Sequence, residues 1–523
     1  MLRSGSTALL ACALLLTAIP ALAQPTITPI AMSGDPAPGP DPTATFSSFW
    51  DYHPSLNDAG HVTFHAWTTG TVITGGRWAE VARPAGSPVL SLVAGFGQPV
   101  AGSTKRLLGF VFDPLPFSSS SQLADSAGLF WPLGITNAVV AGGPGTFKVY
   151  AEEFEPTSPT GVPNMMFGQL SHAPLMNDRG VLTFRTNLVQ VVPTSPPIYG
   201  HGIWTTRNGG VVPIAVSLED DDWVWDAPSY GEPRMNDLGD IIYTTFSPPP
   251  TPDDENSAIV VSRFSGLSIT FLREGDPAPG TPGEFGNFSG WLTINNKGDI
   301  GIHNGYRYQD LFGMRYGNGI WVYRNFAPPP PTALPPAPTP SSELVIDFTT
   351  TAPPGATGTD WYNPGANLSM NNLGQIAFAS QLIPDGHGIW SDAGNTGTVG
   401  LVVKNGQTPP GVGSGFQFGG IFLIGVNDNQ KVAFRATYTD SSSFYAGQGI
   451  WIFDGATGTT SLLIKSGDSV QISPGVTKTV WSIFVAPSQM AGSVGRAFNH
   501  ADDVVAVIRF TDDTQGVFVI NPN

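Results

Sequence analysis

A short motif recurs along this chain at intervals of about 60 residues. "SLNDAGHVTF" begins at Ser55, "LMNDRGVLTF" at Leu175 and "SMNNLGQIAF" at Ser369. Each copy has an apolar stretch, an Asn, a Gly three residues later and an alternating apolar run that ends in Phe. A fixed period of this kind indicates a repeat architecture, in which each unit is one supersecondary element that stacks on its neighbours.

The motif can be followed along nearly the whole chain. Its Asn and Gly positions are Asn57 and Gly60, Asn177 and Gly180, Asn236 and Gly239, Asn295 and Gly298, Asn371 and Gly374, then Asn427 and Asn499 without the Gly. The intervals between the Asn residues are 120, 59, 59, 76, 56 and 72. Because the first interval is twice 60, we expect a degenerate copy between Asn57 and Asn177.

Two further elements follow each Asn motif. One is a glycine followed closely by an aromatic residue: "GRW" at Gly76, "GIW" at Gly202, Gly319, Gly388 and Gly449, and "GVF" at Gly516. "GLF" at Gly128 is expected to supply the same element in the degenerate unit. The other is an apolar strand that ends in a Gly/Pro turn such as "EGDPAPG" from Glu274. Together they predict eight units.

Alternating apolar residues before and after the turns predict four short antiparallel strands in each unit. Four-stranded units repeated radially are typical of a β-propeller. The segment from Thr26 reads as a fourth strand without the three before it, and "GVFVINPN" at the C-terminus reads as a third strand without a fourth. We therefore predict an all-β, eight-bladed propeller whose ring is closed by the N-terminal strand.

The Asn motif suits a turn. A type I turn favours Asn at its first position, and the Gly three residues later accepts positive φ. Alternatively, the Asn and Asp oxygens would each hold a Ca²⁺ ion, since hard cations prefer oxygen ligands. The Asp that follows the Asn in four copies is replaced by Asn296, Asn372 and His500 in the others. We favour the structural turn, with calcium as the one cofactor left open.

The motif also resembles that of a bacterial family of secreted tandem-repeat proteins with the pattern N-x-x-G-x-x-A-F. "NNLGQIAF" from Asn371 matches the pattern, whereas "NDNQKVAF" from Asn427 has Gln430 in place of Gly. The resemblance covers nearly the whole chain. It implies architecture and export, and it lends no catalytic residues.

Residues 1–23 have the features of a secretory signal peptide: Arg3, an apolar run, and small residues before Gln24. We expect a single propeller domain over 24–523, secreted or periplasmic, with a Pro-rich loop insertion at 327–342 and no C-terminal anchor. The only cysteine, Cys12, lies in the signal, which excludes disulfides from the mature chain. A net charge of -17 disfavours nucleic acid and anionic membranes as partners.

Functional residues are expected where one unit departs from the others. The clearest departure is "SLEDDDWVWDAP" from Ser217, in which Asp220, Asp221, Asp222, Trp223 and Trp225 would bind a cation or stack a sugar ring beside carboxylates. A second is "YAEEFEPTSPTG" from Tyr150, where Glu152 and Glu155 are candidates for acid–base catalysis. A third is the aromatic and arginine-rich loop after His303.

The sequence carries no G-x-S-x-G elbow, H-E-x-x-H motif or phosphate loop. We therefore favour a non-catalytic binding or scaffold protein that recognises carbohydrate or protein through its blade-joining loops. The alternative is a secreted hydrolase or lyase that acts on polysaccharide through the loop carboxylates. The sequence leaves the ligand and the oligomeric state open.

Overall fold

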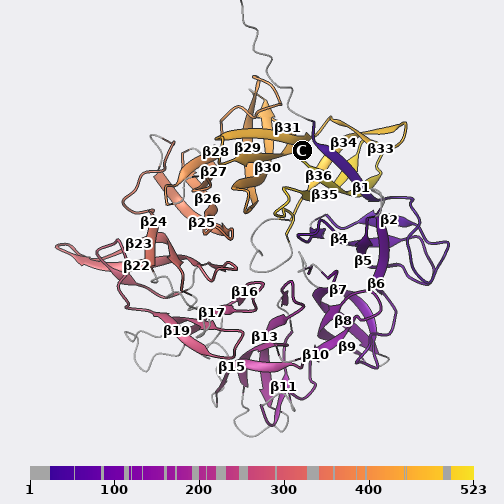
Figure 1. The fold of residues 1–523 in the computed structure, drawn as a ribbon, viewed down its shortest axis with the longest axis horizontal. Helices are drawn as coiled ribbons and strands as arrows, with labels where there is room; N and C mark the ends of the chain where they lie inside the picture. Colours follow the sequence, from indigo (N-terminus) through magenta and orange to yellow (C-terminus); the bar gives the residue numbers. More distant parts are fainter. Residues whose placement is uncertain are drawn as a thin grey trace, which may run out of the picture.

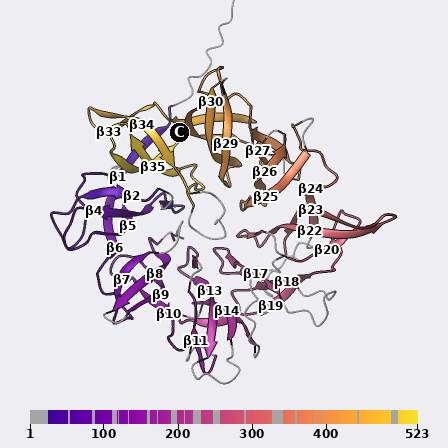
Figure 2. The ribbon, with the colours of Figure 1, turned by 180° about the vertical axis from the view of Figure 1, so that it is seen from behind.

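The computed structural model describes residues 24–522 without 52–53, 84–87, 111–116, 119, 132–133, 158–161, 171–172, 191–198, 208, 220–230, 247–256, 289–290, 327–340, 357–359, 385, 395–396, 441, 443 and 487–495. Eight antiparallel sheets are arranged radially in a ring, and the chain runs once around it (Figure 1). The view from behind shows the same eight units (Figure 2). The predicted eight-bladed β-propeller is confirmed.

The first four blades follow the N-terminal strand β1 (Thr26–Met32). Blade 1 contains β2 (Phe46–Phe49), β3 (Ser55–Leu56), β4 (Val62–Thr68), β5 (Gly75–Ala82) and β6 (Val89–Gly95). Blade 2 contains β7 (Arg106–Phe110), β8 (Leu123–Trp131), β9 (Gly134–Gly142) and β10 (Lys148–Glu152). Blade 3 contains β11 (Met165–Phe167), β12 (Leu175–Met176), β13 (Leu182–Gln190), β14 (Tyr199–Thr205) and β15 (Val212–Glu219). Blade 4 contains β16 (Arg234–Met235), β17 (Ile241–Phe246), β18 (Ser257–Ser262) and β19 (Ser268–Arg273).

The last four blades complete the ring. Blade 5 contains β20 (Glu284–Phe285), β21 (Leu292–Ile294), β22 (Ile300–Asp310), β23 (Gly313–Arg324) and β24 (Ser341–Asp347). Blade 6 contains β25 (Asp360–Met370), β26 (Ile376–Ile383), β27 (Gly386–Ser391) and β28 (Gly400–Lys404). Blade 7 contains β29 (Phe416–Val426), β30 (Lys431–Asp440), β31 (Tyr445–Asp454) and β32 (Thr459–Lys465). Blade 8 contains β33 (Ser469–Ser473), β34 (Val476–Phe484), β35 (Val504–Phe510) and β36 (Gln515–Asn521).

The ring closes through the two ends of the described chain. Strand β1 pairs antiparallel with β36, from Thr26 opposite Asn521 to Met32 opposite Gly516. The N-terminal strand therefore supplies the fourth strand of the last blade, as the sequence predicts. Closure of this kind leaves no unpaired blade edge at the seam.

The degenerate unit is blade 2, and one of its elements differs from the prediction. Ser118 takes the place of the motif Asn, because its carbonyl accepts the turn hydrogen bond from Ser121 N at 3.0 Å. Gly128 lies in β8, the second strand, and pairs with Asn137 of β9. The assignment of "GLF" to the third strand was wrong. The Gly-aromatic pattern of this unit lies in β8, the second strand, whereas β9, the third strand, has no such pattern.

A buried tryptophan on the third strand anchors most blades. Trp78, Trp204, Trp321, Trp390 and Trp451 are each at most 1% exposed. Four of them donate from Nε1 to a proline carbonyl in the Gly/Pro turn that enters the same blade: Trp78 to Pro38, Trp321 to Pro279, Trp390 to Pro354 and Trp451 to Pro410, at 2.9–3.0 Å. The indole thus joins the core to the blade-joining turn while its only donor is satisfied.

In blade 4 the first strand, β16, lies nearer the axis of the ring than the fourth strand, β19 (Figure 1). The described residues form no helix that is long and apolar enough to cross a bilayer. Residues 1–23 and 327–340 lie outside the described part, so the signal peptide and the single-domain assignment remain predictions.

Candidate functional site

The repeated Asn side chains form a belt around the axis. Each of the seven accepts at Oδ1 from the backbone N–H four residues later, at 2.9–3.1 Å. Each also donates from Nδ2 to a backbone carbonyl in the next blade: Asn57 to Ser118, Asn177 to Asn236, Asn236 to Asn295, Asn295 to Asn371, Asn371 to Asn427, Asn427 to Asn499 and Asn499 to Asn57. The motif therefore closes its own turn and joins adjacent blades.

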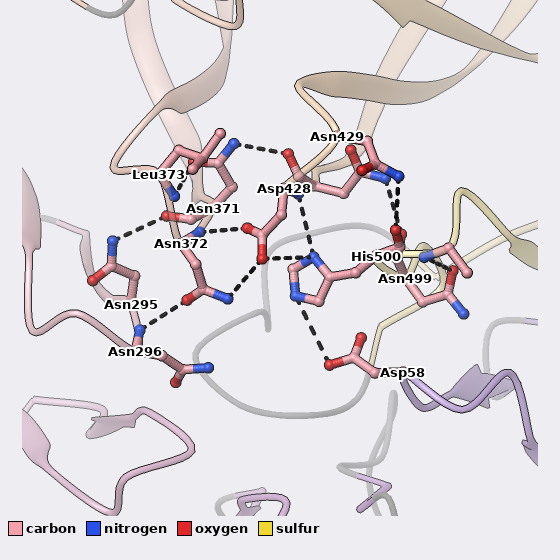
Figure 3. A network of polar contacts seen from close by, with 12 residues as sticks. Asp58, Asn295, Asn296, Asn371, Asn372, Leu373, Asp428, Asn429, Asn499 and His500 are labelled. Atoms are coloured by element: carbon pink, nitrogen blue, oxygen red, sulfur yellow. Dashed lines mark hydrogen bonds and ion pairs between the residues drawn. The ribbon is translucent and has the colours of Figure 1, made fainter.

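The residue after each Asn adds a second set of contacts (Figure 3). Asn296 N donates to Asn372 Oδ1 at 2.9 Å, and Asn372 N donates to Asp428 Oδ1 at 2.6 Å. His500 lies between Asp428 and Asp58, with ring nitrogens 3.3 Å and 3.8 Å from their carboxylate oxygens. Burial and the nearby Arg496 lower the pKa of His500, and the neighbouring carboxylates of Asp58 and Asp428 oppose this shift.

These contacts explain the repeat without a ligand. Positive φ occurs at the fourth position of the turns, with 77° at Gly60 and 79° at Gly374, and 61° at Gln430 where Gly is missing. Within the described residues, no three His, Asp or Glu side chains are grouped so that they would hold a metal ion. The belt therefore adds no support to the calcium alternative, and the functional site must be sought elsewhere.

The residues predicted to bind a ligand have different outcomes. Asp220, Asp221, Asp222, Trp223 and Trp225 lie outside the described residues. Glu152, 6% exposed, forms an ion pair with Lys105 and accepts from Ser103 Oγ at 3.1 Å. Glu155 is exposed in the turn that follows β10. The acid–base pair of Glu152 and Glu155 stays a prediction, with one member already bound to a lysine.

A cavity lies between blades 4 and 5, and its lining begins at Gly231, the residue that follows the acidic loop in the sequence. Its volume is about 290 Å³, and it is lined by Gly231, Glu232, Arg234, Thr244, Phe246, Trp291 and Leu292. Gly231 N donates to Thr244 O at 2.9 Å, and a Cβ at Gly231 would overlap the Thr244 hydroxyl. The glycine therefore lets the chain enter the cavity wall close to β17.

Among the described residues, two arginines and one carboxylate lie in or beside this cavity. Arg185 of β13 lies 3.8 Å from Glu232, which is too long for a hydrogen bond, and Glu232 is 44% exposed. Burial lowers the pKa of Arg185 and of Arg234, and Glu232 opposes the shift in both. In the part of the chain that the structure describes, Glu232 is the carboxylate that interacts with both partly buried guanidinium groups.

Trp291 gives the cavity a flat apolar wall. Its ring packs against the apolar cluster of blades 5 and 6, which fixes its position, and it also lines the cavity. Phe246 adds a second aromatic surface at the end of β17. An aromatic face beside fixed polar groups is the usual composition of a small-ligand site.

The aromatic loop predicted after His303 is a hairpin of β22 and β23. It extends outward from the rim of the ring, away from the axis (Figures 1 and 2). Leu311 at its tip is 98% exposed and Phe312 is 84% exposed. This apolar tip is a second candidate surface.

The cavity residues were missed by sequence reasoning, although a signal existed. Arg234 stands two residues before its Asn, where the other copies carry Ser55, Leu175, Thr293, Ser369, Gly425 or Ala497. A single arginine at a small or apolar repeat position is a departure of the same kind as the acidic loop.

The fold defines this chain as a β-propeller with a ring of eight blades closed by its N-terminal strand. It belongs to a family of unknown function, DUF7453, whose model matches residues 17–310 and 337–522. This family membership does not test the resemblance to the N-x-x-G-x-x-A-F family, which stays a prediction. No curated protein matches the chain.

Similar solved structures are also propellers. The β-propeller domain of the trilobed protease from Pyrococcus furiosus is 8% identical, with a TM-score of 0.38 over 80% of this chain and 98% of that one. The polysaccharide lyase Uly1 is 10% identical, with a TM-score of 0.34 over 84% and 94%. An α-L-arabinanase from Penicillium chrysogenum, complexed with arabinobiose, is 12% identical, with a TM-score of 0.26 over 65% and 99%. At these identities the comparisons concern the fold alone.

Proposed function

We propose that this chain is an exported, non-catalytic propeller that binds a saccharide in the cavity between blades 4 and 5. The observation that carries the proposal is the juxtaposition of Trp291 with the partly buried Arg234 around a space of about 290 Å³. Such a volume is at the lower end of small-molecule sites. It suits one sugar ring, with the rest of a chain outside.

The scaffold supports binding rather than turnover. Glu152, the more buried of the two predicted acid–base residues, is neutralised by Lys105. Among the described residues that line the cavity, Glu232 is the one carboxylate, whereas glycoside hydrolysis by the usual route requires two carboxyl groups across the scissile bond. A bound saccharide is therefore expected to be recovered intact, which chromatography of the ligand after incubation measures.

Saccharide binding is tested with the purified mature chain, 24–523, on a glycan array, beside a Trp291→Ala variant. We expect at least one saccharide to be retained by the wild type and lost by the variant, with both proteins folded by circular dichroism. Removal of a stacking ring costs about 1–3 kcal/mol, which is enough to abolish signal on an array.

A protein partner is the competing outcome, because the β22–β23 tip exposes Leu311 and Phe312. An empty array, together with a captured protein that is lost in a Leu311→Ser/Phe312→Ser variant, would overturn saccharide binding in favour of protein recognition. Export is tested separately: the N-terminus of the protein from its natural source, read by mass spectrometry, is expected to be Gln24.

A further inference from the structure

We infer that the cavity selects an acidic sugar, with Arg234 as the group that binds its carboxylate. This inference rests on the proposed saccharide function and names the class of ligand. It starts from the hydrogen bonds of Arg234. Among the described residues its guanidinium makes one hydrogen bond, from Nη1 to Pro233 O at 3.0 Å. A guanidinium has five N–H donors, so most of them are open to a ligand.

The surroundings of Arg234 make an anion favourable. Burial lowers the pKa of Arg234 because the cation is partly removed from water, and Glu232 offsets this only in part. The guanidinium of Arg185 also interacts with the carboxylate of Glu232, at a distance of 3.8 Å. Charges that are partly removed from water are normally paired, and among the described residues the carboxylate of Glu232 interacts with two cations. A second carboxylate, brought by a ligand, balances the charge.

The shape of the groups favours a carboxylate on a ring. The planar guanidinium fork matches a carboxylate through two parallel N–H···O bonds. Trp291 and Phe246 supply aromatic faces in the same cavity, against which the apolar face of a pyranose packs. A cavity of about 290 Å³ leaves room for one such ring. A hexuronate residue of an oligosaccharide combines the ring and the carboxylate.

Binding is measured by titration calorimetry with three probes of equal length: an oligogalacturonate, the corresponding neutral oligogalactose, and a sulfated oligogalactose. The wild type is expected to bind the oligogalacturonate most tightly. In Arg234→Met, which keeps an apolar stem, uronate affinity is expected to fall roughly 10- to 100-fold, the usual contribution of charge-assisted hydrogen bonds. Arg234→Lys keeps the positive charge but lacks the planar guanidinium fork. Its affinity for the uronate is expected to lie between those of the wild type and Arg234→Met.

Two matched variants separate this site from a general charge effect. Arg179→Met removes the same charge from an exposed position in the Asn177 turn and is expected to leave uronate affinity within about twofold. Glu232→Gln removes the competing carboxylate of the cavity and is expected to increase uronate affinity several-fold, because the ligand is then the only anion. A gain from Glu232→Gln cannot arise from misfolding.

The outcomes distinguish the inference from the function on which it rests. Equal affinity for the neutral and acidic oligosaccharides overturns the inference and leaves saccharide binding intact. Tighter binding of the sulfated probe than of the uronate overturns the choice of a carboxylate. If none of the three probes binds but another array saccharide does, the inference fails alone. If no saccharide of any kind binds, both fail.

Discussion

Arg77 and Asp125 form an ion pair of 3.0 Å between blades 1 and 2, and both side chains are 0% exposed. Arg77 stands in "GRW" where other blades have the Ile of "GIW", and Asp125 stands seven residues after Ser118, where blades 1, 3, 6 and 7 have Phe. In blade 3 the corresponding Ile203 belongs to the same apolar cluster as Tyr243 of blade 4. Two departures from the repeat therefore compensate each other across one interface.

This pairing predicts strong coupling between the two positions. Arg77→Ile alone leaves the Asp125 carboxylate buried without its cation, and we expect a loss of about 3–5 kcal/mol in the free energy of unfolding. Asp125→Phe alone strands the guanidinium and is expected to have a similar effect. The double variant restores the apolar residues of the other blades and is expected to recover most of the loss. Urea unfolding followed by tryptophan fluorescence measures all four proteins, and additive effects of the two substitutions would contradict the compensation.

The Asn belt predicts that a motif Asn stabilises the folded protein through hydrogen bonds in two adjacent blades. Asn371→Ala removes the bond from Nδ2 to Asn427 O at 2.7 Å and the acceptor for Gln375 N at 2.9 Å. Because both partners are buried, we expect a loss of about 2–3 kcal/mol. Asn371→Ser is expected to cost less, since Ser118 Oγ accepts from Gln122 N at 3.1 Å in the equivalent turn. Leu373→Ala, in the same turn and 40% exposed, is the control and is expected to change stability little.

The fold was predictable because its determinants are local and repeated. The turn Asn, the positive-φ residue and the buried Trp recur in most blades, so that each copy supports the reading of the others. Closure by β1 followed from counting strands at the two ends. Blade 2 was read wrongly in part because Ser118 replaces the Asn and β9 has no Gly-aromatic element, so that its register could be found only from pairing.

The candidate site was less predictable because it is made by contacts between blades. Arg185, Glu232 and Trp291 come from three successive blades and approach one another only when the ring closes. The periodicity of the sequence says which positions are equivalent, and it does not say which of them face each other. The Arg77–Asp125 pair has the same origin.

The tryptophans of blades 3 and 7 allow the contribution of an indole hydrogen bond to stability to be measured against a matched control. Trp451 Nε1 donates to Pro410 O at 3.0 Å, whereas Trp204 Nε1 has no hydrogen-bond partner among the described residues. Both rings are 0% exposed, so that Trp→Phe leaves a similar void in each blade. We expect Trp451→Phe to destabilise the protein by about 1 kcal/mol more than Trp204→Phe, the contribution of one buried hydrogen bond. Thermal unfolding of the two variants measures the difference, and equal melting temperatures would refute it.

His303 on β22 predicts a dependence of stability on pH. Burial lowers the pKa of His303 to about 4, and neither ring nitrogen has a hydrogen-bond partner among the described residues. Its ring packs edge-on against Phe348, with centroids 5.8 Å apart. In the unfolded chain the pKa returns to about 6.5, so that the unfolded state takes up the proton first as the pH falls. His303 therefore lowers the free energy of unfolding between pH 6.5 and pH 4, by about 3 kcal/mol in total, and its effect is constant below pH 4.

The variant His303→Phe removes this titration while it keeps an aromatic ring beside Phe348. We expect the difference in unfolding free energy between variant and wild type to increase as the pH is lowered from 7 to 4, because only the wild type has a histidine to protonate on unfolding. Phe348→Leu changes the packing but keeps His303, and its difference from wild type is expected to be independent of pH. Urea unfolding at half-unit pH steps measures both differences. A constant difference for His303→Phe over this range would contradict a lowered pKa of His303 in the folded protein.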